Sequence, residues 1–470
     1  MTDKQLKETA HEFVEANWDA IVEDITTMVK IRSVEDLEHA QPGMPYGPGP
    51  FKALEAGMNL AKRIGLDVHN CDGRIAYADL AGEQDKQIAV IGHTDVVAEG
   101  SGWEYEPFTV THKDGYLIGR GVLDDKGPFV LEMYAAKFLK EQVEATGKKY
   151  PYTLRCIIGN NEETDMADVE WYVKNFEQPE FCFTPDSSFP LVCGEKGGFS
   201  ASIRTADIAD TIVELCGGQA DNAVASDAYA LVKADISTLK PRERIDIEDA
   251  GNGLVKVIGH GVSAHASTPQ SGINAIGLVV DYLVDNNIGT PAEKQFLAFE
   301  QCVFGSTDGS TLTIAATDEI FDPLTCIGGR VFTEGKAFRQ TIDARYPSSV
   351  TDAWLYEQVS TLAAKYDCTV DVDLVLVPFL TDPNNECIKT LVATYNEYTG
   401  REAKPFTIGG GTYARHFKAA GAFGPNDPAF PMPSWLGGEH AANEGFSVEQ
   451  FKRALEIYIV SLVRIMALDL

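Results

Sequence analysis

The sequence predicts an α/β protein in which a doubly wound, mostly parallel sheet forms one domain and a separate α+β domain is inserted into it. A chain of 470 residues is too long for one compact core. Apolar runs alternate with helical segments up to residue 195, as in parallel sheets with crossover helices. Segments with period-2 alternation then dominate residues 196–377. We assign residues 378–470, where helical patterns return, to the first domain.

The first domain, residues 1–195, is expected to begin with a helix, because apolar residues recur at helical spacing from Phe13 to Val29. A loop rich in proline and glycine at 41–50 separates it from the next helix. Pro128 favours a helix start, since its missing N–H is not needed there. The expected helices are 4–31, 51–64, 128–140 and a segment ending near 176, and the expected strands are 87–92, 153–159 and 181–184, with a hairpin at 103–118.

The inserted domain, residues 196–377, alternates apolar and polar residues in short segments, which is typical of strands with one buried face. Beyond it we expect the first sheet to resume, followed by two further helices. The expected strands are 199–203, 254–258, 311–316, 340–342 and 369–377, and the expected helices are 273–284, 352–365, 385–399 and 448–466.

Charge and cysteine usage limit the partners and the compartment. The net charge is −31, from 70 acidic and 39 basic residues, so the surface would repel phosphate backbones and anionic membranes. We therefore expect no nucleic-acid or membrane partner. The nine cysteines include no Cys-x-x-Cys pair, the N-terminus lacks the apolar core of a signal peptide, and no apolar run approaches ~20 residues. These features predict a cytoplasmic protein with reduced thiols.

Two adjacent acids, Asp124 and Asp125, lie between a glycine-rich turn and an expected helix start. Adjacent carboxylates repel each other, and burying both is costly unless a cation is present. We therefore interpret Asp124 as a bridge between two metal ions and Asp125 as a residue that supports the site from behind. The alternative is a solvated N-cap that opens the following helix.

His93 is a further candidate ligand, because it follows an expected strand. Ligand groups of doubly wound sheets gather beyond the carboxyl ends of their strands. Asp95 points to the same side of an extended backbone as His93, so it could fix the tautomer of the imidazole. The alternative is a buried histidine bonded to the backbone.

Acids and one histidine complete the set of candidates. Glu162 and Glu163 are successive acids at a turn, where one could bind a metal while its neighbour acts as general base, or both could favour a helix N-terminus. Asp186 is either a turn cap or a ligand, and His440 is either a loop histidine or the last ligand. Two histidines, three carboxylates and one further glutamate are the inventory of a two-metal hydrolase.

These motifs resemble those of the M20 family of metallopeptidases, most of all its PepV-like bacterial branch of Xaa-His or β-alanyl dipeptidases. The resemblance spans nearly the whole chain and keeps the order of the family. Its strongest segments are Gly92-His-Thr-Asp-Val-Val97, Gly119-Arg-Gly-Val-Leu-Asp-Asp-Lys-Gly127, Asn161-Glu-Glu163, Thr184-Pro-Asp186 and His440-Ala-Ala-Asn-Glu444.

The resemblance implies two divalent ions that share one carboxylate. Zinc is favoured, and manganese or cobalt are alternatives, because imidazole and carboxylate ligands suit all three. Glu162 would be the general base, Asp95 would support the first histidine, and the peptide bond that follows the bridging aspartate would be cis. The implied ligands are His93, Asp124 and Asp186 for one ion and Asp124, Glu163 and His440 for the other.

The resemblance also makes the inserted domain a lid that contacts the substrate. His265 would help to hold the carbonyl oxygen of the substrate, and Asn222 would bind the same region. Arg345 would grip the C-terminal carboxylate with its planar fork, unless it is a surface charge at a strand end. A glycine-rich segment could offer backbone N–H groups to that carboxylate, unless it is a flexible loop. Its residues are Gly410, Gly411 and Thr412.

The implied reaction is hydrolysis of the amide bond of a dipeptide with a free C-terminal carboxylate, in which Glu162 takes a proton from a water between the two metals. The partner would be a small peptide. The long interval between Asp186 and His440 resembles monomeric members of the family, in which a large lid replaces a partner subunit. Two alternatives stay open, an N-acyl-amino-acid deacylase such as a desuccinylase and a catalytically inactive protein that binds metal or peptide.

Overall fold

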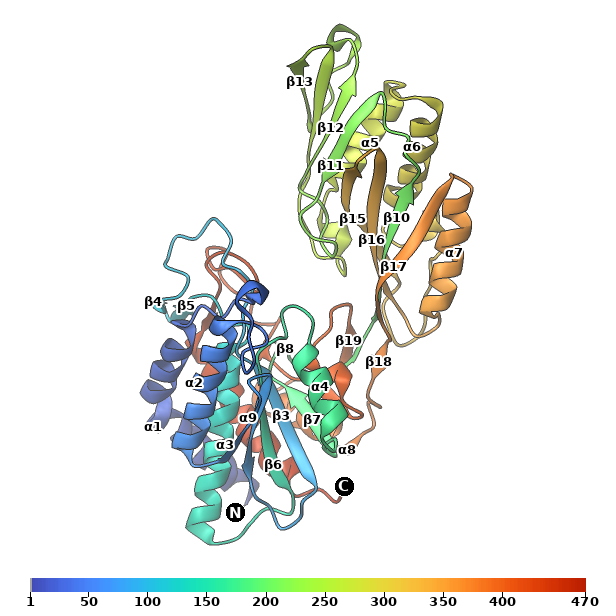
Figure 1. The fold of residues 1–470 in the computed structure, drawn as a ribbon. Coiled ribbons are helices and arrows are strands. Elements are labelled where there is room, and N and C mark those ends of the chain that lie inside the picture. The colour runs from blue at the N-terminus through green and yellow to red at the C-terminus, as the bar shows by residue number, and fades with distance from the viewer. Residues whose placement is uncertain (1) are drawn as a thin grey trace. The chain divides into compact units, whose positions relative to one another are not determined.

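The computed structural model describes residues 2–470, which divide into two compact units (Figure 1). The first unit extends to Cys193 and also includes Leu380–Phe406 and Gly411–Leu470. The second unit comprises Gly194–Phe379 and the short segment Thr407–Gly410. The assignment of this short segment to the second unit is not anticipated by the sequence pattern. Among the described residues, no helix combines the length and apolar character needed to cross a membrane.

The first unit contains a mixed sheet with a parallel centre. Its strands are β1 (Asp67–Cys71), β2 (Ile75–Leu80), β3 (Gln87–His93), β6 (Thr153–Gly159), β7 (Phe181–Thr184), β9 (Val192–Glu195), β18 (Phe379–Leu380), β19 (Phe406–Ile408) and β20 (Ala420–Ala422). The order is β1-β2-β6-β3-β7-β20-β9-β18, with β19 beside β9. The neighbours β6, β3, β7 and β20 pair in parallel, and antiparallel pairs flank them. Central parallel strands are buried on both faces, which explains their continuous apolar runs and confirms the predicted α/β class.

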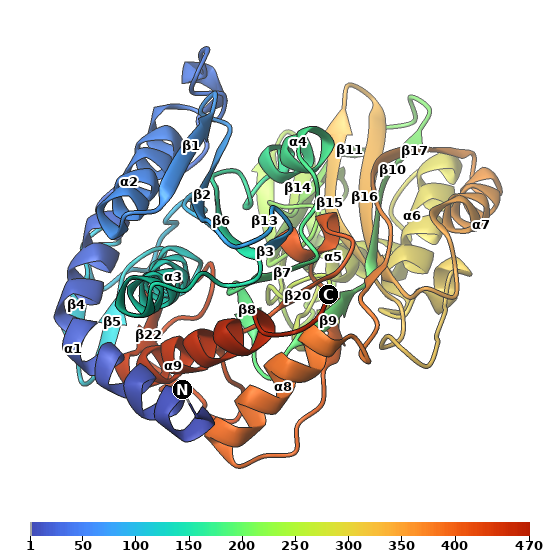
Figure 2. The ribbon, with the colours of Figure 1, turned by 90° about the horizontal axis from the view of Figure 1, so that it is seen from below.

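Helices cover both faces of this sheet (Figure 2). Helix α3 (Lys126–Thr146) lies over β3 and β6 and packs between α1 (Asp3–Val29) and α9 (Val448–Ile465). Its first half is buried all round, because the sheet and both helices enclose it. On the same side α2 (Pro48–Ile64) and α8 (Glu386–Thr399) complete the layer, whereas α4 (Ala167–Asn175) covers the opposite face.

Two small sheets join segments that are distant in the sequence. Strand β22 (Gly445–Ser447) pairs with β5 (Tyr116–Ile118), which forms a hairpin with β4 (Thr111–Lys113). Strand β8 (Ser187–Ser188) pairs with β21 (Pro425–Asn426). Because Gly445 lies opposite Ile118, the residues just before β22 come to lie beside the residues just after β5.

The second unit contains an antiparallel sheet covered by helices on one face (Figure 1). Its strands are β10 (Gly197–Thr205), β11 (Ile212–Gly217), β12 (Asp227–Lys233), β13 (Ile245–Gly251), β14 (Leu254–His260), β15 (Thr325–Glu334), β16 (Ala337–Tyr346) and β17 (Cys368–Leu376), in the order β13-β14-β12-β11-β15-β16-β10-β17. The helices are α5 (Ala275–Asp285), α6 (Pro291–Phe304) and α7 (Asp352–Ala364). Apolar side chains of the sheet and of these helices form one core.

One predicted strand of this unit, 311–316, is wrong. Leu312 and Ile314 are buried and their neighbours Thr311 and Thr313 are exposed, which imitates the alternation of a strand. The left-handed φ values at Gly309 and Thr313 instead bend the backbone into tight turns around a 3₁₀ helix. The strand of this region is β15, which begins nine residues further on, and neither it nor α6 is anticipated by the sequence pattern.

Candidate active site

The carboxyl ends of three parallel strands lie together, and the candidate ligands follow them. Strand β3 ends at His93, which pairs with Gly159 at the end of β6. Glu162 and Glu163 follow β6 within a turn, and Asp186 follows β7. Because parallel neighbours end at the same edge of the sheet, the three loops converge there.

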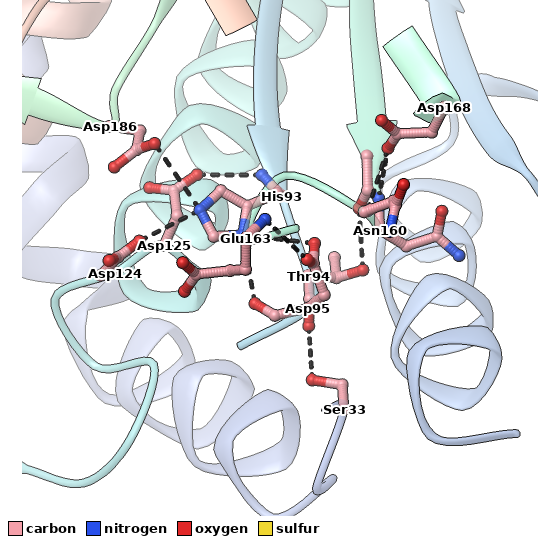
Figure 3. A network of polar contacts seen from close by, with 12 residues as sticks. Ser33, His93, Thr94, Asp95, Asp124, Asp125, Asn160, Glu163, Asp168 and Asp186 are labelled. Atoms are coloured by element: carbon pink, nitrogen blue, oxygen red, sulfur yellow. Dashed lines mark hydrogen bonds and ion pairs between the residues drawn. The ribbon is translucent and has the colours of Figure 1, made fainter. Parts of the chain in front are cut away.

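Asp124 contacts both histidines of this cluster, and its contact with His93 is drawn in Figure 3. Its Oδ1 is 3.0 Å from Nε2 of His93, and its Oδ2 is 3.0 Å from Nε2 of His440. Oε2 of Glu163 is 2.9 Å from the same nitrogen of His440. Oδ2 of Asp186 is 3.6 Å from Nε2 of His93. Each oxygen of Asp124 therefore faces a different imidazole, which is the arrangement of a carboxylate shared between two positive centres.

His93 is held from behind by Asp95. Nδ1 of His93 is 3.1 Å from the carbonyl oxygen of Asp95 and 3.4 Å from its carboxylate. We therefore assign the ring hydrogen to Nδ1, which turns the Nε2 lone pair towards the cluster. The other carboxylate oxygen of Asp95 accepts a hydrogen bond from the N–H of Glu163 at 3.1 Å. Asp95 thus contacts two candidate ligands, and its backbone carbonyl is closer to the imidazole than its carboxylate.

Asp125 lies behind the cluster and does not cap a helix. It is fully buried, and its side chain makes no capping hydrogen bond to α3. Its Oδ2 accepts a hydrogen bond from the N–H of His93 at 3.0 Å. The peptide bond between Asp124 and Asp125 is cis, as the resemblance implies. A solvated N-cap at this position is therefore excluded.

Burial and mutual repulsion set the protonation of these groups. Burial raises the pKa of Glu162 well above its ordinary value, and burial together with the nearby Asp124 raises the pKa of Glu163 to about 7. Burial would also raise the pKa of Asp124, but hydrogen bonds from His440 and His93 outweigh it and lower that pKa. Carboxylates this close together need positive charge, which imidazolium groups or divalent cations can supply.

The donor set fits divalent metal ions. Ligand atoms of His93, Asp124 and Glu163 lie within 4.8 Å of one another, and so do those of His93, Glu162 and Asp186. Imidazole and carboxylate donors of this kind suit zinc, manganese or cobalt. Glu162 belongs to the second group together with Asp186, so proximity alone does not separate a ligand from a general base.

Two pairs of residues beside the cluster are absent from the sequence-based prediction. The hydroxyl of Tyr413 donates to Oδ2 of Asp168 at 2.5 Å, and the same oxygen accepts the N–H groups of Asn160 and Asn161 at 2.8 and 3.1 Å. These bonds hold the turn that leads into Glu162, and Figure 3 shows Asp168 beside Asn160 at the start of this turn. Asp168 has the sequence signature of an ordinary acid in the first turn of a helix, so no local pattern indicates this contact.

Arg120 and Glu444 are the second pair. They form a buried ion pair next to Asp124, with Nη1 of Arg120 2.5 Å from Oε2 of Glu444. Both belong to segments that carry the resemblance, which is the one signal in the sequence that could have drawn attention to them.

Asn222 and His265 lie close together in the second unit. Ala266 donates its N–H to the carbonyl oxygen of Asn222 at 2.9 Å, and Ala223 forms a β-bridge with His265. Both side chains are exposed. The N–H of Ser267 donates to Nδ1 of His265 at 3.2 Å, so the neutral ring carries its hydrogen on Nε2 and can donate it to an oxygen.

Arg345, at the end of β16 in the second unit, is not a surface charge. Its Nε and Nη2 donate to the two carboxylate oxygens of Asp343 at 2.7 and 3.1 Å, and its side chain is only 11% exposed. The surface-charge alternative is therefore wrong. Asp343 fixes the plane of the guanidinium, which retains further N–H donors beyond these two bonds.

The glycine-rich segment lies between β19 and the 3₁₀ helix Tyr413–His416. Gly410 belongs to the second unit, and Gly411 and Thr412 belong to the first. Oγ1 of Thr412 accepts the N–H of Ala414 at 3.1 Å and so caps the 3₁₀ helix. This bond gives Thr412 a structural role besides the one expected of its backbone N–H.

Comparison with known proteins decides the family. A model described as peptidase family M20/M25/M40 matches residues 89–463, a span that contains every candidate metal ligand. The chain belongs to this family. The family is metal-dependent, so this M20 chain is a metal-dependent peptidase, and the cluster around Asp124 contains side chains that could hold a metal ion.

Bacterial relatives match the M20 chain over nearly its whole length. The dipeptidase candidate YtjP of Bacillus subtilis (strain 168) is 30% identical over 454 residues, which cover 93% of this chain and 95% of the relative. A dipeptidase candidate of Staphylococcus epidermidis is 31% identical over 461 residues, covering 94% and 96%.

Solved structures share the fold at lower sequence identity. Human carnosine dipeptidase 1 has a TM-score of 0.59 and 14% identity, covering 98% of this chain and 100% of that one. The di-peptidase Dug1p of Saccharomyces cerevisiae has a TM-score of 0.61 and 13% identity, covering 98% of each chain. These likenesses show that the M20 chain has the fold of these enzymes.

Proposed function

We propose that the M20 chain hydrolyses the amide bond of dipeptides that carry a free C-terminal carboxylate. The main support for this proposal is the position of Asp124. Its two carboxylate oxygens face the imidazoles of His93 and His440, and further carboxylates lie beside them. His93 and Asp186 would hold one ion with Asp124, and Glu163 and His440 would hold the other. Zinc is favoured, and manganese or cobalt are alternatives. The description of the relatives as dipeptidases supports the substrate class.

Glu162 is the residue that we propose as general base. When bound, two such ions would lower the pKa of a water and polarise the carbonyl of the substrate. The carboxylate of Glu163 is tied to the N–H of Val97 and to His440, as suits a ligand. Within residues 2–470, the carboxylate of Glu162 accepts no hydrogen bond, so it can turn towards the reacting atoms. Burial raises its pKa and so makes its carboxylate a stronger base, which suits it to take a proton from water and to pass it to the leaving amine nitrogen.

The second unit would act as a lid that supplies the remaining contacts to the substrate. We propose that Nε2–H of His265 donates to the carbonyl oxygen as negative charge develops there. Asn222, whose backbone is bonded next to His265, would bind the same region. Arg345 would bind the C-terminal carboxylate with the donors that it does not give to Asp343. Gly410, Gly411 and Thr412 would add backbone N–H groups to that carboxylate.

Two variants at adjacent positions test the division of roles. Glu162→Ala should keep both ions, while kcat for a dipeptide falls by about 10²–10⁴-fold, the usual contribution of a general base. Glu163→Ala is the matched control and should lose one ion. Metal content is counted by mass spectrometry and activity by release of free amino acid. Loss of an ion in the first variant but not in the second would reverse the two roles.

A substrate panel tests the reaction itself. Purified protein with Zn²⁺, Mn²⁺ or Co²⁺ should cleave dipeptides faster than N-acyl amino acids and faster than dipeptides with an amidated C-terminus. Preferential cleavage of N-succinyl or N-acetyl amino acids would make the chain a deacylase. Absence of turnover with every metal and substrate would make it a binding protein.

We also propose a cytoplasmic monomer. All nine cysteines are free, and burial raises the pKa of most of these thiols, which supports a protein that does not depend on disulfides. Sedimentation equilibrium should give the mass of one chain, 51.2 kDa. Twice that mass would refute the monomer.

A further inference from the structure

Arg120 and Glu444 form an ion pair that is almost completely shielded from solvent. Arg120 is 1% exposed and Glu444 is 0% exposed. A buried ion pair contributes little to stability on its own, because the desolvation of both charges offsets their attraction. What these two side chains contact is therefore more informative about their role than the pair itself.

Glu444 binds the backbone of the turn that carries Asp124. Its Oε1 accepts the N–H groups of Gly121 at 3.0 Å, Leu123 at 2.9 Å and Asp124 at 3.1 Å. Three donors on one carboxylate oxygen fix the conformation of the turn, and the last of them belongs to the proposed bridging ligand itself.

Arg120 binds the loop that carries His440. Its Nη2 donates to the carbonyl oxygen of His440 at 3.2 Å, while its Nη1 holds Oε2 of Glu444. The N–H of Gly119 also donates to the carbonyl oxygen of Glu444 at 2.8 Å. His440 has a left-handed backbone, with φ of +60°. This conformation costs free energy for a residue other than glycine and persists only where the surroundings enforce it.

We propose that Arg120 and Glu444 are positioning residues that hold Asp124 and His440 at the spacing needed to share one metal ion. This inference rests on the proposed function. The backbone N–H of Asp124 bonds one partner of the ion pair, and the backbone carbonyl of His440 bonds the other. The two ligands come from segments far apart in the sequence, and the ion pair is a direct link between their backbones.

The two ions should respond differently to loss of this ion pair, because they share only some of their ligands. Asp124 serves both ions, but His440 serves only the ion that Glu163 also binds. Loss of the link between Arg120 and the His440 loop should therefore lower the affinity for that ion and leave the affinity for the ion held by His93 unchanged.

Glu444→Gln should keep the contacts of residue 444 with the Asp124 turn and remove its contact with Arg120. A glutamine keeps the shape of the side chain, and its carbonyl oxygen can still accept the three backbone N–H groups that include that of Asp124. Its NH₂ group would then face Arg120 donor to donor, which breaks the connection to the His440 loop. The double variant with Arg120→Met removes this donor clash without restoring the connection.

The experiment measures zinc stoichiometry and affinity by dialysis against zinc buffered with a chelator, together with urea unfolding of the metal-free proteins. Wild type should bind two ions. Both Glu444→Gln and the double variant should bind one ion about 10- to 100-fold more weakly, the usual effect of losing a residue that supports a metal ligand. Asp79→Asn is the matched control, since Asp79 and Arg155 form another largely buried ion pair, 2.7 Å apart, away from the cluster.

Each outcome decides between distinct conclusions. Fewer than two ions on wild type would refute the proposed function and with it this inference. Two ions of unchanged affinity on Glu444→Gln would overturn the inference alone. Recovery of both ions in the double variant, or an equal loss in Asp79→Asn, would also overturn it, because the effect would then come from an unpaired charge or from general destabilisation.

Discussion

Gly159→Ala should destabilise the first unit and disturb the active site together. An ideal Cβ on Gly159 would lie 2.2 Å from the hydroxyl oxygen of Tyr413 and 2.5 Å from its Cε2. Tyr413 is buried, so its ring cannot turn into solvent. Strand β6 cannot move away easily either, because the N–H and the hydroxyl of Thr94 both donate to the carbonyl oxygen of Gly159 at 2.9 Å. The ring must therefore shift and release Asp168.

The magnitude follows from these contacts. Overpacking a buried site costs about 1–3 kcal/mol. Loss of the hydrogen bond from Tyr413 to a buried carboxylate adds about 1.5–3 kcal/mol. Alanine is more favourable than glycine inside a strand by roughly 0.5–1 kcal/mol, which offsets part of this cost. We expect the free energy of unfolding to fall by about 2–5 kcal/mol, the net of these three effects.

Urea unfolding followed by circular dichroism measures this change, and dipeptide hydrolysis reports on the turn before Glu162. Gly438→Ala is the matched stability control, because a Cβ at Gly438 meets no atom within 4 Å. Tyr413→Phe removes the hydroxyl alone, and its combination with Gly159→Ala should be less damaging than the sum, since both changes act on one contact. A free energy of unfolding for Gly159→Ala within about 0.5 kcal/mol of wild type, the range of ordinary surface substitutions, would refute the reasoning.

Three other changes test separate parts of the molecule. Asp124→Asn should remove both ions, because both would share its carboxylate, and mass spectrometry that still finds two would contradict the bridge. Arg345→Lys should raise KM about tenfold or more, equivalent to ~1.4 kcal/mol, because an ammonium lacks the planar fork that bonds Asp343 with two donors and keeps others for the substrate carboxylate. An equal effect on amidated dipeptides would argue against this role. Burial lowers the pKa of His416 to about 4, so the unfolded chain takes up a proton first as the pH falls below 6.5 and stability is lost between 6.5 and 4. His416→Gln should reduce that loss by up to ~3 kcal/mol in urea unfolding at pH 7 and 4.5, and identical losses in both proteins would contradict the assignment.

The strands that carry the cluster could be predicted because their signal is local. Strands β6 and β7 occur at the predicted bounds, since each is a short apolar run between segments that are more polar. His93, Glu162 and Asp186 lie at the ends of such runs. In parallel sheets, the groups that bind ligands gather beyond the carboxyl ends of the strands. The sequence could also indicate Asp124 as a candidate, because burying two adjacent acids is costly unless a cation is present.

The contacts that hold the cluster could not be predicted, because they join residues that are far apart in the chain. Nothing local relates Asp168 to Tyr413, and the position of His440 depends on the pairing of β22 with β5. The second unit was harder for another reason. Its strands are half-exposed, so the alternation at 311–316 resembled theirs although the backbone there is turned by positive φ values.

The register of β3 and β6 limits where residues can be inserted into or deleted from this chain. His93 lies opposite Gly159 because the two strands are aligned from their first paired residues onward. One residue inserted into β3 would send the imidazole to the other face of the sheet. Two inserted residues would restore the face but displace the imidazole by about 6–7 Å along the strand. Insertions and deletions among relatives should therefore avoid residues 87–93 and collect in the exposed loop near residues 98–106.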